Sequence, residues 1–173
     1  MNRNGVTRAL HEVFETQVIN HGDYNLVCAQ PCRPGPALVL GYRSTPLELV
    51  LCPVTLLQLP LSSGDERRVM AIPAGPVSSI DLSNVATLAD TGTGYQVETV
   101  TGFRASFEVE DTLRTVVASP TGHADATVGV QQAAAAESFH EFMDHFMDVL
   151  DGFYRVPDDT EGLQDTYNPP VAA

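Results

Sequence analysis

Two pairs of potential metal ligands lie four residues apart near the C-terminal end of the sequence. His140 and Asp144 form one pair, and Glu141 and His145 form the other. In a helix this spacing places both members of a pair on one side, where imidazole and carboxylate groups can bind a divalent cation. A complete site generally needs three or four ligands, so another segment has to supply a third. The same residue types are typical of the solvated side of a surface helix, which is the interpretation we favour.

A second candidate for chemistry is Asp90, in the segment Leu88-Ala89-Asp90-Thr91-Gly92-Thr93. Two apolar residues followed by Asp-Thr-Gly resemble the signature of aspartic proteases, in which two aspartates share a proton and activate water. The resemblance implies that Asp90 is a catalytic carboxylate and that a chain of this length dimerises to supply the second one. Gly94 follows at once, so residues 90–94 also fit a glycine-rich turn between two strands.

The three cysteines are Cys28, Cys32 and Cys52. An odd number argues against a framework of disulfides, and the three-residue gap between Cys28 and Cys32 differs from the two-residue gap of redox pairs and zinc knuckles. We expect buried free thiols, because free cysteine behaves as a small hydrophobic residue. A metal site formed by Cys28, Cys32 and His21 is the alternative.

Other catalytic and cofactor motifs are absent from the sequence. It contains no Gly-x-Ser-x-Gly nucleophile motif. A Gly-x4-Gly-Lys phosphate-binding loop is ruled out because the chain has no lysine. We therefore assign no catalytic residue, no cofactor and no metal site, and the sequence favours a non-enzymatic protein.

Acidic residues outnumber basic ones by 22 to nine, which gives a net charge of −13. Such a charge repels nucleic-acid phosphates and anionic lipid head groups, so we expect neither nucleic acid nor a membrane as a partner. No apolar run is long enough to span a bilayer. The N-terminal segment carries His11, Glu12 and Glu15 where a signal peptide would be apolar, so we expect a cytoplasmic protein.

The 173 residues are expected to form one domain over residues 1–156, followed by a flexible acidic tail over 157–173. Apolar periodicity predicts a short amphipathic helix over residues 6–18. From Tyr24 onward, short apolar segments separated by Pro and Gly predict consecutive strands. The expected strands are 24–29, 37–43, 47–52, 54–59, 68–72, 77–82, 95–100, 103–110 and 113–118. Residues 119–129 are expected to form a loop.

Two of these strands form the clearest pair. Apolar and polar residues alternate over 103–110, and Thr101-Gly102 suits a tight turn after 95–100. Pro53 interrupts the long apolar segment 47–61. Because proline has no amide hydrogen for a central ladder, that segment is interpreted as two strands or as one bent edge strand.

A long amphipathic helix is predicted from about residue 131 to residue 150, with Gly152 and Pro157 as terminators. Its apolar stripe consists of Phe139, Phe142, Met143, Phe146, Met147 and Leu150, with Tyr154 as a further candidate beyond them. This stripe has two interpretations: it covers the sheet as part of the core, or it forms a contact surface. On the second interpretation these six residues bind a partner.

Consecutive strands followed by one C-terminal helix resemble the pleckstrin-homology-like fold, including its bacterial and GRAM-like members. The resemblance lies in the segments VTLLQLPL, RRVMAIPAGPVSSIDLS, GYQVETVTG and FRASFEVED, and in the helix FHEFMDHFMDVLDGFY. The segment from Ile72-Pro73 to Ile80 is similar to an Ile-Pro-x-x-x-Val-x-x-Ile-like segment of bacterial members. Lipid-binding members carry a basic cluster near the first hairpin, where residues 30–36 offer only Arg33. A protein-binding or structural role is therefore implied.

The sequence thus predicts an α+β protein with a mostly antiparallel sheet or barrel, a short N-terminal helix and a long C-terminal amphipathic helix. We hypothesise a non-enzymatic module that binds a protein partner or assembles with itself, for example as a homodimer. Two alternatives stay open. One is a dimeric aspartic-type or metal-assisted hydrolase that uses Asp90 or the pair His140 and Asp144. The other is an acidic decoy that inhibits a nucleic-acid-binding protein by mimicking phosphate charge.

Overall fold

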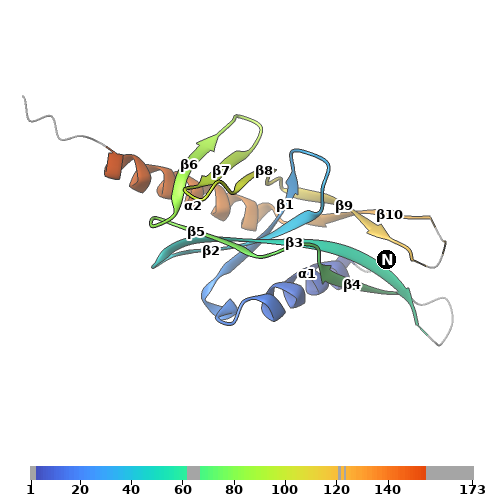
Figure 1. Ribbon diagram of the computed structural model, residues 1–173. Coiled ribbons are helices and arrows are strands. Elements are labelled where there is room, and N and C mark those ends of the chain that lie inside the picture. The colour runs from blue at the N-terminus through green and yellow to red at the C-terminus, as the bar shows by residue number, and fades with distance from the viewer. Residues whose placement is uncertain (1–2, 62–66, 121, 123, 155–173) are drawn as a thin grey trace, which may run out of the picture.

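The computed structural model describes residues 3–61, 67–120, 122 and 124–154. These residues form one open, ten-stranded sheet with a helix on each face (Figure 1). The α+β class predicted from the sequence is confirmed. The expected tail over 157–173 lies outside the described residues.

In chain order the helices and strands are α1 (Arg3–Gln17), η1 (His21–Asp23), β1 (Asn25–Pro31), β2 (Ala37–Ser44), β3 (Leu47–Pro60), β4 (Arg67–Pro73), β5 (Ser78–Asp81), β6 (Val85–Asp90), β7 (Tyr95–Thr99), β8 (Arg104–Glu108), β9 (Thr112–Ala118), β10 (Ala126–Gln131) and α2 (Ala133–Tyr154). The main order across the sheet is β10-β9-β3-β2-β1-β8-β7-β6. Neighbouring strands are antiparallel except β3 and β9, which run parallel.

The long strand β3 organises the sheet because each of its edges pairs with two strands in succession. One edge pairs with β2 as far as Val54 and then with β9 from Leu56. The other edge pairs with β5 over 48–51 and with β4 from Val54 onward. The first half of β3 therefore lies in one part of the sheet, between β2 and β5, and the second half lies in another, between β9 and β4.

Pro53 lies within β3, so the prediction of two strands is wrong, and so is the alternative of an edge strand. The carbonyl of Pro53 accepts a hydrogen bond of 2.9 Å from the amide of Ala74. In an antiparallel strand the amide and carbonyl of one residue face the same edge, so the proline nitrogen faces the gap between β5 and β4. Its missing hydrogen therefore removes no bond to β2, and the strand can continue.

Two hydrophobic cores lie on opposite faces of the sheet. On one face α1 buries Val6, Leu10, Val13 and Phe14 against alternate residues of the central strands. On the other face α2 packs on the remaining alternate residues, together with β7 and β8. The period of two in the strands and the period of about 3.6 in both helices match this arrangement.

The predicted hairpin of 95–100 and 103–110 is confirmed as β7 and β8, with Gly102 in the turn at a φ of +91°. Both helices are also present. Two strands were missed. The expected loop over 119–129 contains the first four of the six residues of β10. Val128 and Val130 of this strand are buried, and the strand pairs with β9. In β6 a register shift between Val85 and Thr87 breaks the alternation that would have identified it.

Candidate functional site

Three residues that the sequence suggested for chemistry lie in one pocket of about 390 Å³. Asp90 is the last residue of β6, at the start of the turn to β7, whereas His140 and Asp144 come from successive turns of α2. Tyr95, the first residue of β7, lines the same pocket. The fold therefore brings together two candidate sites that are 50 residues apart in the chain.

Tyr95 links this pocket to the core. Its hydroxyl oxygen lies 2.6 Å from Nδ1 of His140. Burial, together with the carboxylates of Asp90 and Asp144, raises the pKa of Tyr95 to about 12. The phenol thus keeps its proton at neutral pH and can donate it to the imidazole in a hydrogen bond. The ring of Tyr95 also packs against Phe139, with 5.7 Å between centroids, so this contact ties β7 to α2.

Asp90 has a role in its own turn. Its Oδ1 accepts a hydrogen bond of 2.8 Å from the amide of Gly92, a residue with a φ of +84°. The amide of Thr91 donates to the carbonyl of Gly94 over 2.9 Å. The glycine-rich turn considered from the sequence is therefore present, and it holds this carboxylate at the rim of the pocket.

The part of the chain that the structure describes contains no group of three or more His, Cys, Asp or Glu side chains placed to hold a metal ion. All three cysteines are free. Cys28 and Cys52 are buried, as expected. The expectation is wrong for Cys32, which is exposed because it follows Pro31 at the tip of the β1–β2 hairpin, where neither helix covers it.

We expect alkaline pH to destabilise the protein. The pKa of Tyr95 is about 12 in the folded chain and about 10 when unfolded. When folding raises a pKa, the group contributes fully to the free energy of unfolding at pH values below its unfolded pKa. This contribution is lost as the pH rises towards and through its folded pKa, and for Tyr95 the loss is about 2 to 3 kcal/mol at most. Burial also raises the pKa of the Cys28 thiol to about 12, which adds a loss in the same direction.

Urea unfolding at about pH 8 and about pH 11 measures this loss. Tyr95→Phe has no phenolic proton, so it should lose clearly less stability between the two pH values than the unchanged chain. At the lower pH the variant should be about 1 kcal/mol less stable, because the hydrogen bond to His140 is gone. Equal alkaline losses in the two chains would contradict the assignment to Tyr95.

Five of the six residues predicted to bind a partner lie between α2 and the sheet. Phe139, Phe142, Met143, Phe146 and Leu150 are each at most 8% exposed. Met147 is half-buried and packs against the same core. The core interpretation therefore accounts for the stripe in this fold. Partner binding by these residues stays a prediction, and the five buried side chains offer no exposed surface for it.

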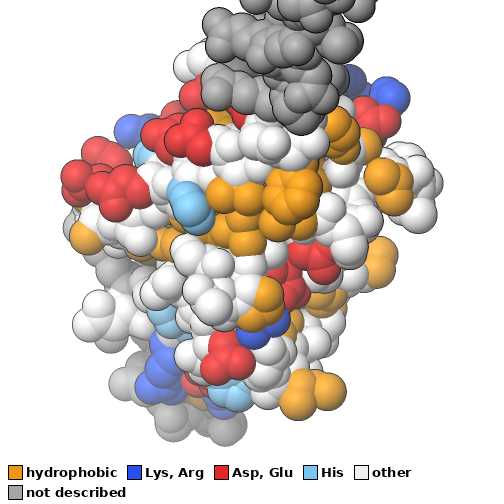
Figure 2. Space-filling model, turned by 90° about the vertical axis from the view of Figure 1, so that its left-hand side faces the viewer, with side chains coloured by type: hydrophobic (Ala, Val, Ile, Leu, Met, Phe, Trp, Pro, Cys, Tyr) orange, Lys and Arg blue, Asp and Glu red, His pale blue; other side chains and the backbone are white. Residues whose placement is uncertain are grey.

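The apolar stripe of α2 continues past the edge of the sheet. Phe153 follows Phe146 by seven residues and so lies on the same side of the helix, yet it is 71% exposed, and Tyr154 is 67% exposed. Figure 1 shows that this end of α2 projects beyond the strands. Figure 2 views the molecule from that side, and an apolar patch with acidic groups near it is visible on this end of the molecule. We call Asp148, Asp151, Phe153 and Tyr154 the α2 end.

At the opposite end of the sheet, a second apolar surface is exposed that the sequence analysis did not identify. There β4 and β9 flank the second half of β3, and neither strand contributes a residue to the hydrophobic core beneath α2. Strand register places six residues on the side of the sheet that α2 covers elsewhere, and we call them the open face: Leu57, Leu59, Met70, Ile72, Val116 and Ala118. Exposure is 54% for Val116, 39% for Ile72 and 38% for Met70.

One signal in the sequence could have revealed the open face. In β4 the residues that face α1, Val69 and Ala71, are apolar, and so are Met70 and Ile72 between them. A strand that is apolar on both sides is typical of a sheet covered on both faces. In this chain α1 covers only one of them.

The charged strand residues that the register places beside the open face are both arginine, while the carboxylate of Asp125 lies near the end at Ala118, where its Oδ1 accepts a hydrogen bond of 3.1 Å from the amide of Ser119. The register places Arg68 next to Leu59 and Arg114 two residues before Val116. Among the described strand residues that point to this surface from the second half of β3 and from β4, β9 and β10, none is Asp or Glu. In a chain with 22 acidic residues, this part of the surface is therefore distinct in charge.

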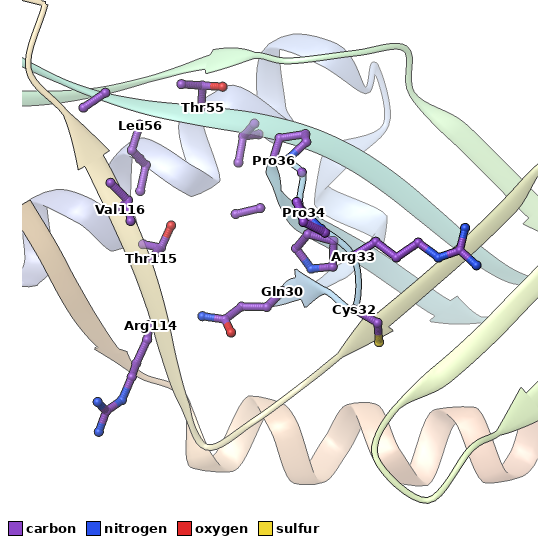
Figure 3. Close-up of a pocket in the computed structure, with 15 residues that line it drawn as sticks. Gln30, Cys32, Arg33, Pro34, Pro36, Thr55, Leu56, Arg114, Thr115 and Val116 are labelled. Atoms are coloured by element: carbon purple, nitrogen blue, oxygen red, sulfur yellow. The ribbon is translucent and has the colours of Figure 1, made fainter. Parts of the chain in front are cut away.

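A cleft of about 470 Å³ borders the open face where β3 changes its partner from β2 to β9 (Figure 3). The tip of the β1–β2 hairpin forms one wall and β9 forms the other. The guanidinium groups of Arg33 and Arg114 point away from each other in Figure 3, so they do not converge on a common anion. Neither makes an ion pair with a described residue. The cleft thus extends the edge of the open face without forming a small-anion site.

Comparison of the chain with family models, with curated proteins and with solved structures found no match. The pleckstrin-homology-like assignment therefore stays a prediction. Within the described residues, no helix has the length and apolar character needed to cross a membrane.

Proposed function

We propose that this protein is a non-enzymatic binding module whose open face binds a protein segment carrying apolar side chains beside acidic ones. The observation that carries the proposal is the composition of that surface. Its centre is apolar, its charged neighbours Arg68 and Arg114 are cationic, and it lies on a chain with a net charge of −13.

Exposed apolar area supports binding, because contiguous apolar patches on soluble proteins often mark interaction sites. Ile72 and Met70 lie on β4 beside Thr55 and Leu57 of β3, and Val116 lies on β9 at the other edge of β3, so the exposed apolar side chains flank one short stretch of that strand. The core of a protein interface is typically apolar, with charged groups at its rim. The open face has this arrangement.

The two arginines support an acidic partner segment. Arg114 has no ion-pair partner within the described chain, and it is exposed beside Val116. A carboxylate on the partner can pair with it in a bidentate geometry. The net negative charge of the whole chain opposes binding of polyanions such as nucleic acid, so a local apolar and acidic protein surface is a better match than a phosphate backbone.

A photo-cross-linking residue at position 116 tests the proposal in the full-length chain, expressed in its native host. We expect a protein adduct whose cross-linked peptide contains apolar residues next to Asp or Glu. Arg114→Glu should reduce the yield by roughly tenfold, since it reverses a charge at the rim. The same probe at position 19, where Ile19 is fully exposed at the end of α1, is the control. Absence of an adduct at position 116, or an equal yield at both positions, would falsify the proposal.

Three other statements from the sequence stay predictions. A hydrolase that uses Asp90 or His140 is tested by Asp90→Asn and His140→Ala, which should abolish any hydrolytic activity found. An acidic decoy is tested by the salt dependence of its binding to a nucleic-acid-binding protein. Cytoplasmic location is tested by cell fractionation.

A further inference from the structure

We infer that the occupant of the open face is the α2 end of a second copy of this chain, so that copies assemble head to tail. This inference rests on the proposed function of the open face and names its partner. The α2 end carries exposed Phe153 and Tyr154 beside exposed Asp148 and Asp151. It therefore has the chemistry expected of the partner segment.

The described residues of its own chain leave the α2 end uncovered. Phe153 continues the stripe of Phe139, Phe146 and Leu150, which are buried against the sheet. The end of α2 projects beyond the strands (Figure 1), and Phe153 in its last turn is 71% exposed. An apolar surface on another molecule can bury Phe153 as the sheet buries the apolar residues of the earlier helix turns. Removing this apolar area from water favours association.

Charge selects among the ways in which two copies can meet. Contact between two open faces brings Arg68 and Arg114 of each copy together, and contact between two α2 ends brings Asp148 and Asp151 together. Like charges at an interface oppose association. Only contact between an open face and an α2 end pairs arginine with aspartate while covering apolar groups on both sides.

The two surfaces lie at opposite ends of the molecule, with the α2 end beyond β6 and the open face at β4 and β9 (Figure 1). When two copies associate in this way, the resulting dimer still has one free open face and one free α2 end, and so does every larger open assembly. Such a heterologous interface makes rings or open chains instead of stopping at a symmetric dimer. Assembly should grow with protein concentration and weaken with salt.

Complementation between two variants of the full-length chain tests the inference. One variant, Met70→Asp with Val116→Asp, has a damaged open face and an intact α2 end. The other, Phe153→Asp with Tyr154→Asp, has the reverse. Light scattering coupled to size exclusion should show assembly of the unchanged chain, and each variant alone should associate at least roughly tenfold more weakly. Their mixture should form a one-to-one heterodimer that grows no further, because only one intact interface is left.

Ile19→Asp is the matched control for adding a carboxylate at an exposed apolar position, and it should assemble like the unchanged chain. Circular dichroism and the urea midpoint show whether each variant is folded. For a variant that fails to fold, the charge reversals Arg114→Glu and Asp148→Arg replace the damaged pair. Each variant alone should then associate weakly and their mixture should assemble, because the unchanged charges and the reversed charges both form opposite-charge pairs.

The outcomes separate the inference from the proposed function. A chain that stays monomeric at every concentration, but gives an adduct with another protein at position 116, overturns head-to-tail assembly and leaves the proposed function intact. Assembly of the unchanged chain without heterodimer formation by the mixture also overturns the inference, because it indicates a symmetric interface. Absence of both assembly and adduct overturns both proposals.

Discussion

Phe139→Ala should destabilise the protein by about 3–5 kcal/mol, because it leaves a cavity where α2 meets the sheet. Phe139 is fully buried. Its ring is 5.3 Å from that of Tyr42 on β2 and 5.7 Å from that of Tyr95 on β7. These surrounding rings belong to strands fixed by hydrogen bonds, so they cannot collapse fully into the space. Urea denaturation followed by circular dichroism measures the change.

Phe153→Ala is the control, since the same side chain is removed from the same helix at a position that is 71% exposed. In the monomer it should change the free energy of unfolding by less than about 0.5 kcal/mol. Similar losses for the two variants would contradict the assignment of Phe139 to the core. The comparison also separates the two interpretations of the stripe, because a contact surface would tolerate Phe139→Ala in the isolated chain.

Gly41→Val should cost about 3 kcal/mol through overpacking between β2 and α1. A Cβ atom at Gly41 would lie 2.7 Å from Cε2 of Phe14, and Phe14 is fully buried. Strand propensity works in the opposite direction, since valine is favoured over glycine there by about 1 kcal/mol. The overlap is expected to win, because relieving it requires α1 to move away from the sheet. The urea midpoint gives the sign and the size.

Two further variants show whether Phe14 is the cause. Phe14→Leu replaces the ring that overlaps with the new valine by a shorter side chain. The double variant Phe14→Leu with Gly41→Val should therefore be more stable than the sum of the two single changes predicts. Gly129→Val makes the same substitution in β10, where the nearest atom to an added Cβ is Cγ2 of Thr112 at 3.4 Å. It should be close to neutral. A large loss at Gly129, or strict additivity with Phe14→Leu, would refute the explanation.

Local patterns predicted the elements whose stabilising contacts are close in sequence. The hairpin of β7 and β8 was identified because its alternation and its turn glycine lie within 15 residues, and α2 because six apolar residues recur on one side. β10 was missed because Gly129 and the small residues before it look like a loop until β9 provides a partner. Pro53 was misjudged because no local pattern shows which edge of a strand its nitrogen will face.

For the candidate sites too, the sequence identified residue types, whereas the positions of the residues relative to one another depended on contacts between distant segments. Asp90, His140 and Asp144 were recognisable as residue types, but only the packing of α2 beside the β6–β7 turn places them in one pocket with Tyr95. Conversely, Leu57, Met70 and Val116 lie in segments that were predicted to be strands, with no local sign of which side of each strand would be left uncovered. They form a surface because β9 and β4 join the sheet where α2 no longer covers it.

The sequence by itself determined the acidic charge, the α+β class and the amphipathic character of both helices, since these depend on composition and on periods of two and 3.6 residues. Only the tertiary structure decided that the described residues cover the Phe and Met stripe but leave its last turn exposed. The length of a helix follows from its own residues, but the extent of the sheet beneath it follows from pairing between strands far apart in the chain. The mismatch between the two leaves the α2 end and the open face exposed.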